Sequence, residues 1–364
     1  MLYSCCDLDA LVANARTISA LSKKKLIAVL KHDAYSCGIK ECALALKDEV
    51  FAFAVENMSE AKTLRSLCLN KKIFLLAPIE KHTLFCELSD IVLPIDCIDI
   101  IDALNDIYIK QTDISLRVDL CGSGIGLRES DFETALQKIA STPSLNLFSV
   151  FVHCPSLYQS QDEEKIRAAF SRLCRRAKKL NRRCVCHLAT SASWRNDALG
   201  FDALRLGTNL FGLPSFDAQD VSFLRPVLSL YSNVERILSV EGELSFYDCK
   251  QRLSRPTRLG IIGSGYGYLP ALLDKRDISL LINGAYVKTV GSVYMGHLIV
   301  DLSEIEGVRV GDAAVFVGKS GGKEISALQF AKSVGVSPCR CEGSLFTTKS
   351  AQKIFLSNDN CILK

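Results

Sequence analysis

A lysine directly follows the first long apolar run of the sequence. Lys31 comes after Leu26–Leu30, a run that is typical of a buried strand. An ammonium group is costly to bury unless it is used, and a lysine that gives up its proton at such a place can form a Schiff base with an aldehyde. A lysine whose stem lies along the protein rim and whose charged head reaches water is the alternative.

Two later apolar runs end in residues that suit an anion. Cys184–Ala189 is followed by Ser191, and Ala203–Gly207 is followed by Thr208. Hydroxyl groups and backbone N–H groups at the ends of neighbouring strands form the usual phosphate site of parallel barrels. An amine for an aldehyde together with a cradle for a phosphate is what pyridoxal phosphate requires. The lysine and the cradle together therefore predict this cofactor.

The elements that carry these residues are eight apolar runs separated by amphipathic stretches. The runs are Leu26–Leu30, Val50–Val55, Ile73–Ala77, Ile91–Ile95, Ile114–Leu120, Leu147–His153, Cys184–Ala189 and Ala203–Gly207. The stretches with helical spacing include Lys40–Lys47, Met58–Leu69, Asp131–Ala140 and Glu163–Leu180. Eight such units predict an α/β protein built on a (β/α)8 TIM-like barrel, with its site at the carboxyl ends of the strands. A doubly wound open sheet is the alternative.

The pattern changes near Pro214–Pro226. Beyond it lie strand-like segments bounded by Gly, Asn and Asp, namely Val227–Val240, Arg258–Ile262, Ser279–Ile282, Ala285–Val293, Leu298–Leu302 and Ala313–Val317. Asn283-Gly284 between two apolar runs predicts a two-residue hairpin. We therefore expect the barrel to occupy residues 9–222 and a mostly β C-terminal domain to occupy residues 223–364 together with residues 1–8.

The composition excludes several classes of protein. The 364 residues are 48% apolar and 23% charged, which excludes disordered, collagen-like and coiled-coil chains. We find no apolar run of 18 residues and no signal peptide, so we expect no membrane span and no secretion. The net charge of +4 is too small to indicate a nucleic-acid partner. The basic residues between Arg172 and Arg183 predict a solvated helix face rather than a nucleic-acid patch, because no aromatic residues interleave with them.

Sixteen cysteines are many for this length. Cys184 and Cys186, and likewise Cys339 and Cys341, have CxC spacing, but no second pair completes a zinc site, so we expect no metal. Most of the cysteines are interpreted as small buried apolar residues. Without a secretion signal, the reducing cytoplasm is the expected compartment.

The order and spacing of the motifs resemble those of alanine racemases, the barrel-type pyridoxal-phosphate enzymes, over essentially the whole chain. The matching segments are Ala28–Gly38 (family AVVKANAYGHG), Val118–Gly126 (KvDTGMxRLG), His187–Ala192 (HAANSA), Leu204–Leu213 (vRPGiaLYG), Gly263–Tyr268 (GYADGY) and Val290–Met295 (vGRVcMD). The resemblance implies this fold, pyridoxal 5'-phosphate as cofactor and a head-to-tail homodimer with shared active sites.

The resemblance assigns catalysis to Lys31 and Tyr266. Lys31 would hold the cofactor through a Schiff base and act as one acid/base, and Tyr266, reaching in from the partner subunit, would act on the opposite face. Either Ser264 or Tyr266 could match the tyrosine of GYADGY, and a gap-free match selects Tyr266. His153 would orient and tune that tyrosine.

The resemblance also implies the contacts of the cofactor. The residues that would hold the phosphate are Tyr35, Ser191, Gly207 and Thr208. Arg205 would face the pyridine nitrogen. Because a guanidinium does not give up its proton, that nitrogen would stay unprotonated, which restrains transamination and decarboxylation.

Four positions depart from the family pattern. Gly124 replaces the arginine that binds the substrate carboxylate, and Arg117 replaces the lysine that braces that arginine. Gly296 replaces an aspartate after Met295, which would contact the substrate from the partner subunit. Phe355 stands at a late tyrosine that binds the phosphate, and one lost hydroxyl contact costs about 1 kcal/mol.

Arg117 is hypothesised to bind the substrate carboxylate itself, because its planar guanidinium matches a carboxylate. An arginine that merely pairs with Asp119 is the alternative. Gly124 and Gly296 each remove a side chain from the substrate approach, so amino acids larger than alanine are also expected to fit.

The expected function is a pyridoxal-phosphate-dependent amino-acid racemase of the EC 5.1.1 type, which interconverts L- and D-alanine by a two-base Lys/Tyr mechanism. D-Alanine would serve as a peptidoglycan precursor. A decarboxylase or lyase of the same fold and a catalytically weakened cofactor-binding homologue are the alternatives. The expected partners are a small amino acid and a second copy of the chain, without nucleic acid or membrane.

Overall fold

The computed structural model describes residues 1–79, 90–107, 111–154, 157, 161–216, 219–336, 351–357 and 360–363. Two compact units share the chain. The barrel unit comprises Val12–Ala34 and Cys42–Leu210, and the β unit comprises Met1–Leu11, Tyr35–Glu41 and Phe211–Lys364. Each unit is described by itself.

The barrel unit contains eight parallel strands in the order β8-β7-β6-β5-β4-β3-β2-β9. The strands are β2 (Lys25–Val29), β3 (Ala52–Val55), β4 (Lys72–Leu75), β5 (Ile91–Ile95), β6 (Thr112–Val118), β7 (Leu145–Val152), β8 (Val185–His187) and β9 (Ala203–Leu206). The backbone N–H of Arg205 donates to Ala189 O at 3.0 Å, and Thr190 bridges Arg205, which joins the two ends of the sheet. The predicted barrel is therefore confirmed, and the open sheet is excluded.

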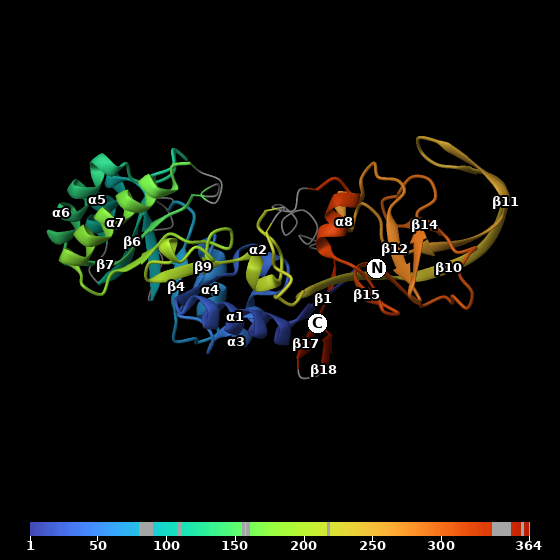
Figure 1. Ribbon diagram of the computed structural model, residues 1–364, viewed down its shortest axis with the longest axis horizontal. Helices are drawn as coiled ribbons and strands as arrows, with labels where there is room; N and C mark the ends of the chain where they lie inside the picture. Colours follow the sequence, from blue (N-terminus) through green and yellow to red (C-terminus); the bar gives the residue numbers. More distant parts are fainter. Residues whose placement is uncertain are drawn as a thin grey trace. The chain divides into compact units, whose positions relative to one another are not determined.

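The strands are buried because both of their faces are covered. β3 and β5 are buried at every position, as continuous apolar runs predict for parallel strands. The helices are α1 (Leu8–Ser22), α2 (Lys31–Tyr35), α3 (Ile39–Leu46), α4 (Met58–Arg65), α5 (Ile98–Ile107), α6 (Phe132–Ala140) and α7 (Glu163–Leu180). Figure 1 shows α5, α6 and α7 alongside β6 and β7. None of the described helices is long and apolar enough to cross a bilayer.

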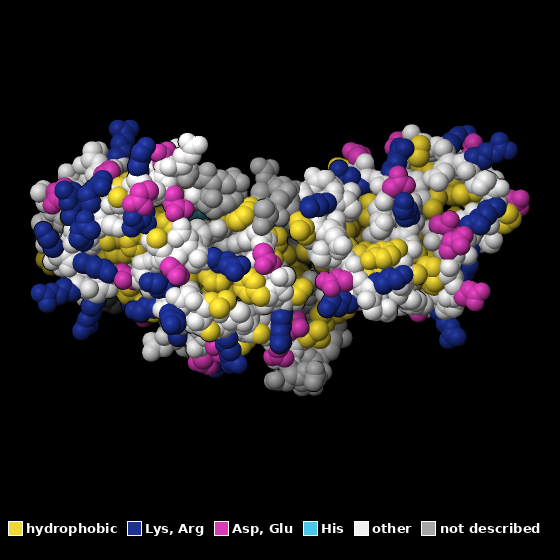
Figure 2. All heavy atoms as spheres, in the orientation of Figure 1, with side chains coloured by type: hydrophobic (Ala, Val, Ile, Leu, Met, Phe, Trp, Pro, Cys, Tyr) yellow, Lys and Arg dark blue, Asp and Glu magenta, His cyan; other side chains and the backbone are white. Residues whose placement is uncertain are grey.

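Helix α7 carries the basic stretch of the sequence on an exposed face. On the opposite face Phe170 and Leu173 are fully buried, whereas Leu180 at the end of the helix is exposed. Arg172 and Arg176 are exposed and form ion pairs with Glu129 and Glu133. Figure 2 shows the acidic and basic side chains interspersed over this region. The predicted solvated helix face is confirmed.

The β unit contains a ten-stranded sheet. Its strands are β1 (Tyr3–Asp7), β10 (Leu228–Ser245), β11 (Lys250–Ile262), β12 (Ser279–Ile282), β13 (Ala285–Lys288), β14 (Leu298–Asp301), β15 (Ala313–Ser320), β16 (Lys323–Ile325), β17 (Gln352–Ser357) and β18 (Asn360–Leu363), and its helix is α8 (Ala327–Ser333). β10 and β11 form a long curved ribbon (Figure 1). β1 lies between β10 and β17, antiparallel to the first and parallel to the second.

The hairpin predicted from Asn283-Gly284 joins β12 and β13. Ile282 pairs with Ala285, and the two turn residues have φ of 46° and 76°. Asn and Gly tolerate this left-handed conformation better than other residues. The turn is therefore of the two-residue kind that the sequence predicts.

Candidate active site

Lys31 lies directly beyond the carboxyl end of β2. Its side chain is 36% exposed, and its Nζ lies 3.1 Å from Glu56 Oε2. Glu56 in turn lies directly beyond the end of the neighbouring strand β3. The amine is therefore held at the mouth of the barrel beside a carboxylate.

The backbone after Lys31 takes an uncommon course. His32 to Ser36 all have φ between 51° and 68°, a left-handed conformation that costs about 1–2 kcal/mol per residue without glycine. The Glu60 carboxylate accepts hydrogen bonds from Asp33 N at 3.3 Å and from Glu56 N at 2.9 Å. Glu60 thus connects the turn that follows Lys31 to the residue that pairs with Lys31.

Arg205 is a buried cation inside the barrel, with 4% of its surface exposed. Its Nη1 donates to His187 Nδ1 at 2.6 Å and to His187 O at 2.9 Å, and its Nη2 donates to Val152 O at 2.6 Å. The guanidinium also lies 5.0 Å from the centre of the Phe151 ring. The pKa of Arg205 is lowered by burial and by Arg117, yet a guanidinium keeps its proton at neutral pH.

His187 is the main side-chain partner of Arg205. Its ring stacks on Phe151, with centroids 5.3 Å apart and planes 3° from parallel. Burial, and then Arg205, hold the pKa of His187 well below its ordinary value. The ring is therefore neutral, and because Nδ1 accepts from Arg205 we assign its hydrogen to Nε2. Nε2 is buried and has no hydrogen-bond partner among the described residues.

His153 follows β7 by one residue. Its surroundings desolvate it, and Arg205, Arg117 and Lys31 all repel an added proton, so the pKa of His153 is lowered. The ring stays accessible to solvent in the single chain. Three cations therefore act on one neutral histidine at the barrel mouth.

The end of β9 meets the segment that follows β8. Ser191 Oγ accepts from Gly207 N at 3.0 Å and from Asn209 N at 3.4 Å. Asn209 is fixed by Trp194, whose Nε1 donates to Asn209 Oδ1 at 2.8 Å. The structure thus brings together Ser191, Gly207 and the adjoining Thr208, as the predicted phosphate cradle requires.

Two residues at positions where the family resemblance implies phosphate contacts lie in the β unit. Tyr35 is 9% exposed and packs edge-on against Phe211, with ring centroids 5.1 Å apart. Phe355, in β17, is 2% exposed. A Cβ on Gly38, where φ is +88°, would lie 2.8 Å from the Phe355 ring. Within the β unit Phe355 is therefore a buried packing residue.

The motif that carries Tyr266 pairs with the segment that carries Met295. Tyr266 N donates to Tyr294 O at 3.1 Å, and Gly267 N donates to Met295 O at 2.9 Å. A Cβ on Gly265 would lie 1.9 Å from Tyr294 O, so only glycine permits this approach. The structure brings Tyr266 and Met295 together, with Tyr266 half-buried and Met295 62% exposed.

Arg117 lies near the carboxyl end of β6. Its Nη1 donates to Leu76 O at 3.2 Å, and its Nε is buried without a hydrogen-bond partner among the described residues. Burial lowers the pKa of Arg117, against the opposing effect of nearby acids. Within the part of the chain that the structure describes, no ion pair joins Arg117 to an acid.

Asp119 organises the turn that follows β6. Its carboxylate accepts hydrogen bonds from the backbone N–H groups of Cys121, Ser123 and Gly124, at 3.1, 3.0 and 2.7 Å. Gly124 is exposed, and a Cβ built on it would meet nothing within 4 Å. The turn is therefore held by one carboxylate and leaves open space at Gly124.

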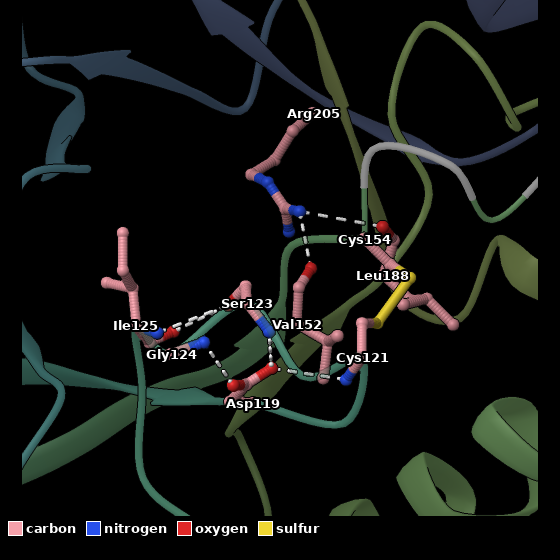
Figure 3. The surroundings of a disulfide bond; sticks show 9 residues. All are labelled: Asp119, Cys121, Ser123, Gly124, Ile125, Val152, Cys154, Leu188 and Arg205. Carbon is pink, nitrogen blue, oxygen red and sulfur yellow. Dashed lines mark hydrogen bonds between the residues drawn. A yellow bond between two sulfur atoms is a disulfide. The ribbon is translucent and has the colours of Figure 1, made fainter.

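A disulfide joins Cys121 to Cys154 at this turn. Figure 3 shows it between the Asp119 turn and the segment of Val152 and Cys154 near Arg205. Most of the cysteines are expected to be small buried apolar residues; Cys121 and Cys154 are instead bonded to each other. Spacing alone does not reveal the pairing, because the barrel places the ends of β6 and β7 side by side.

Three residues of the site are absent from the sequence-based prediction. Glu56 follows an apolar run and would have been found by the rule that identifies Lys31. His187 also ends an apolar run, but its contact with Arg205 depends on barrel closure. Glu60 acts from the first turn of α4, and no local signal marks it. Among the described residues, no cluster of His, Cys, Asp or Glu could hold a metal ion.

Two family models match nearly the whole chain. The model described as alanine racemase, N-terminal domain, matches residues 6–215, and that described as alanine racemase, C-terminal domain, matches residues 227–345. A curated alanine racemase of Chromohalobacter salexigens is 31% identical over 335 residues, which cover 86% of this chain and 88% of the relative. Alanine racemase 2 of Caldanaerobacter subterraneus subsp. tengcongensis is 27% identical over 348 residues, or 91% and 89% of the two chains.

Solved structures share the fold. The alanine racemase of Clostridium difficile 630 superposes with a TM-score of 0.88 at 20% identity, over 100% of this chain and 98% of that one. The alanine racemase of Bacillus anthracis with bound L-Ala-P gives a TM-score of 0.86 at 22% identity, over 99% and 96%. At these identities the likeness shows the fold alone.

Replacement of Asp119 by Asn should destabilise the protein at neutral pH by about 1–2 kcal/mol, because an uncharged amide offers one acceptor oxygen to three N–H groups. Burial raises the pKa of Asp119, but the backbone N–H groups of Ser123, Gly124 and Cys121 lower it more. The stabilisation is therefore complete above the ordinary carboxyl pKa of about 4 and is lost as pH falls through the lowered value.

Urea unfolding of both proteins between pH 7 and pH 3 measures this difference. Replacement of the exposed Asp197 by Asn is the control, and we expect it to have little effect. A difference for Asp119→Asn that stays constant as the pH falls would contradict the assignment.

Proposed function

The chain belongs to the alanine racemase family and is an amino-acid racemase, an isomerase, and from this premise we propose that it uses pyridoxal 5'-phosphate to interconvert L- and D-alanine in the cytoplasm. The observation that carries the proposal is the set of residues at the mouth of the barrel. There Lys31 lies beside Glu56, and the cradle of Ser191 and Gly207 joins the ends of β8 and β9. The same unit thus holds an amine and a cradle that suits an anion.

The barrel residues fit this cofactor. Its aldehyde, pyridine nitrogen and phosphate would be held by Lys31, by Arg205 and by the Ser191 cradle with Thr208. Arg205 supports the fit, because its Nε takes part in none of the hydrogen bonds described and no acid pairs with it among the described residues. When bound, the cofactor supplies an electron-withdrawing ring that makes the α-hydrogen of an attached amino acid acidic.

Racemisation needs two groups that exchange a proton at Cα on opposite faces. Lys31 Nζ is the group on one face, and the Glu56 carboxylate at 3.1 Å stabilises its ammonium form once it has taken a proton. We assign the other face to Tyr266 of the partner subunit in a homodimer. The exposure of the two candidates supports this choice, because Ser264 is fully buried whereas Tyr266 is only half-buried.

Arg205 favours racemisation over decarboxylation. Val152 O and the Nδ1 and O atoms of His187 fix its guanidinium. A group that keeps its proton cannot protonate the pyridine nitrogen, and a neutral ring stabilises negative charge less well. Deeper electron withdrawal, which decarboxylation and transamination require, is therefore restrained.

Arg117 is the group that we assign to the substrate carboxylate. Its Nε is buried without a hydrogen-bond partner in the described residues, and Asp119 is already committed to three backbone N–H groups. A planar guanidinium can bind a carboxylate through two parallel hydrogen bonds. The open space at Gly124 and at Gly296 supports acceptance of substrates larger than alanine.

Replacement of Lys31 by Ala should abolish the visible absorption of the lysine-bound cofactor, because it removes the amine that directly follows β2. Borohydride reduction of the wild type, followed by peptide mapping, should find the cofactor on the peptide that contains Lys31. Lys40→Ala, at an exposed position, should keep the band. A label on another lysine would refute the assignment.

Mixed dimers of Lys31→Ala and Tyr266→Phe subunits should regain activity that neither variant has alone. Random pairing of equal amounts makes half of the dimers mixed, and each mixed dimer has one intact site, so about a quarter of wild-type activity is expected. The measurement is racemisation followed by chiral chromatography, after subunit exchange has been verified by mass spectrometry. Verified exchange without regained activity would place both residues in one subunit.

Replacement of Arg117 by Lys should raise the KM for the best amino acid at least tenfold, or about 1.4 kcal/mol, because a lysine lacks the planar fork. The absorption of the bound cofactor should stay unchanged. The control is Arg16→Lys, which changes an arginine in a surface ion pair with Glu49 and should leave the KM unchanged. Wild-type kinetics of Arg117→Lys on a panel of amino acids would rule out the carboxylate role.

A further inference from the structure

The disulfide lies beside the proposed substrate site, just beyond the carboxyl ends of β6 and β7. Cys121 is two residues beyond Asp119, and Cys154 directly follows His153; their Cα atoms are 5.9 Å apart. The bond therefore connects the turn after β6 to the end of β7, the strand that gives Val152 O to Arg205. Figure 3 shows these groups around the sulfur atoms.

Few other contacts among the described residues hold this turn. Gly122, Ser123, Gly124 and Ile125 are all exposed, and Gly122 and Gly124 have φ of 71° and 76°. The contacts that order them are the three bonds to Asp119 and the mutual bonds of Ser123 and Ile125. The disulfide is the covalent link from this turn to β7, so its loss would loosen the turn more than the barrel core.

Cys121 and Cys154 both line a pocket that is large enough for a small thiol. Its volume is about 420 Å³, and its walls include Cys121, Cys154 and Leu120. Two ion pairs among its lining residues, Lys165 with Asp162 and Arg172 with Glu129, make it polar. Cys121 is half-buried and Cys154 is 6% exposed, so we assign the attack of an incoming thiolate to Cys121, the more exposed residue of the two.

We propose that Cys121–Cys154 is a reversible thiol–disulfide switch that controls substrate binding, a proposal that rests on the function proposed above. In the oxidised state the bond orders the turn beside Arg117 and fixes the position of His153. In the reduced state the turn loosens, the KM rises, and cofactor binding by Lys31 and Ser191 persists. A disulfide in a reducing compartment is usually a transient, redox-sensing one.

The chemical step is exchange with a dithiol. A thiolate of the dithiol attacks Cys121 Sγ, the Cys121–Cys154 bond breaks, and Cys154 leaves as a thiolate that takes up a proton. The second thiol of the reagent then attacks the mixed disulfide, which releases the Cys121 thiol and the oxidised cyclic reagent. Two electrons and two protons pass from the dithiol to the protein.

Dithiothreitol treatment of the holoenzyme tests the switch. Without reductant, alkylation and peptide mapping should recover Cys121 and Cys154 as one cross-linked pair, and with it both should be alkylated. The KM should rise at least threefold upon reduction, with kcat changed less than twofold and the absorption of the bound cofactor retained. Reoxidation should restore the original KM. An unlinked pair in the unreduced protein, or a KM that ignores reduction, would overturn the proposal.

Variants separate the switch from general effects of the reagent. Cys121→Ser combined with Cys154→Ser should show the raised KM at all times and no response to dithiothreitol. Cys68→Ser, which alters an exposed free cysteine, should respond as the wild type does. A double variant that still responds would assign the effect to other cysteines and refute the switch.

Hydrogen exchange keeps this test independent of the proposed function. The backbone N–H groups of Ser123 and Gly124, which are bonded to Asp119, should exchange faster after reduction, whereas those of β2 should not change. If the protein racemises no amino acid but this difference appears, the proposed function fails and the redox control of the turn stands. If the exchange rates at the turn are the same before and after reduction, the proposed switch is refuted, whatever activity the protein has.

Discussion

The burial of Arg205 is the constraint on which the barrel mouth depends. Removing a guanidinium from water costs several kcal/mol unless acceptors replace the solvent, and here Val152 O and two atoms of His187 do so. These acceptors come from β7 and β8, and Arg205 itself comes from β9. Satisfying one charge therefore fixes the ends of three strands, including those that lead to His153, Ser191 and Gly207.

The same charge sets the electrostatics of the site. Arg205 acts together with Arg117 and Lys31 on His153, which is thereby kept neutral. Such a concentration of positive charge suits a ligand with a phosphate and a substrate with a carboxylate. Glu56 is the acid that partly offsets this charge. It pairs with Lys31, and the two arginines form no ion pair with an acid among the described residues.

The fold could be predicted wherever the decisive signal is local. Continuous apolar runs located all eight barrel strands, and Asn283-Gly284 located a hairpin, because both depend on neighbouring residues. The contacts of Arg205 with His187 and of Glu60 with Asp33 could not be predicted, since they form only when distant strands close into a barrel. The left-handed course after Lys31 has no sequence signal either, because His32 to Tyr35 include no glycine. The pairing of Cys121 with Cys154 likewise depends on the adjacency of two strand ends.

The position of β1 has a consequence for how the chain is made. Residues 3–7 pair with β10, which begins at Leu228, and with β17, which begins at Gln352. During translation the segments of the barrel emerge before either partner strand, so the barrel can fold while the first strand is still alone. Contacts between such distant residues form slowly, and an unpaired strand invites aggregation. β1 therefore stays unpaired until β10 has been made, and its second edge stays open until β17 follows.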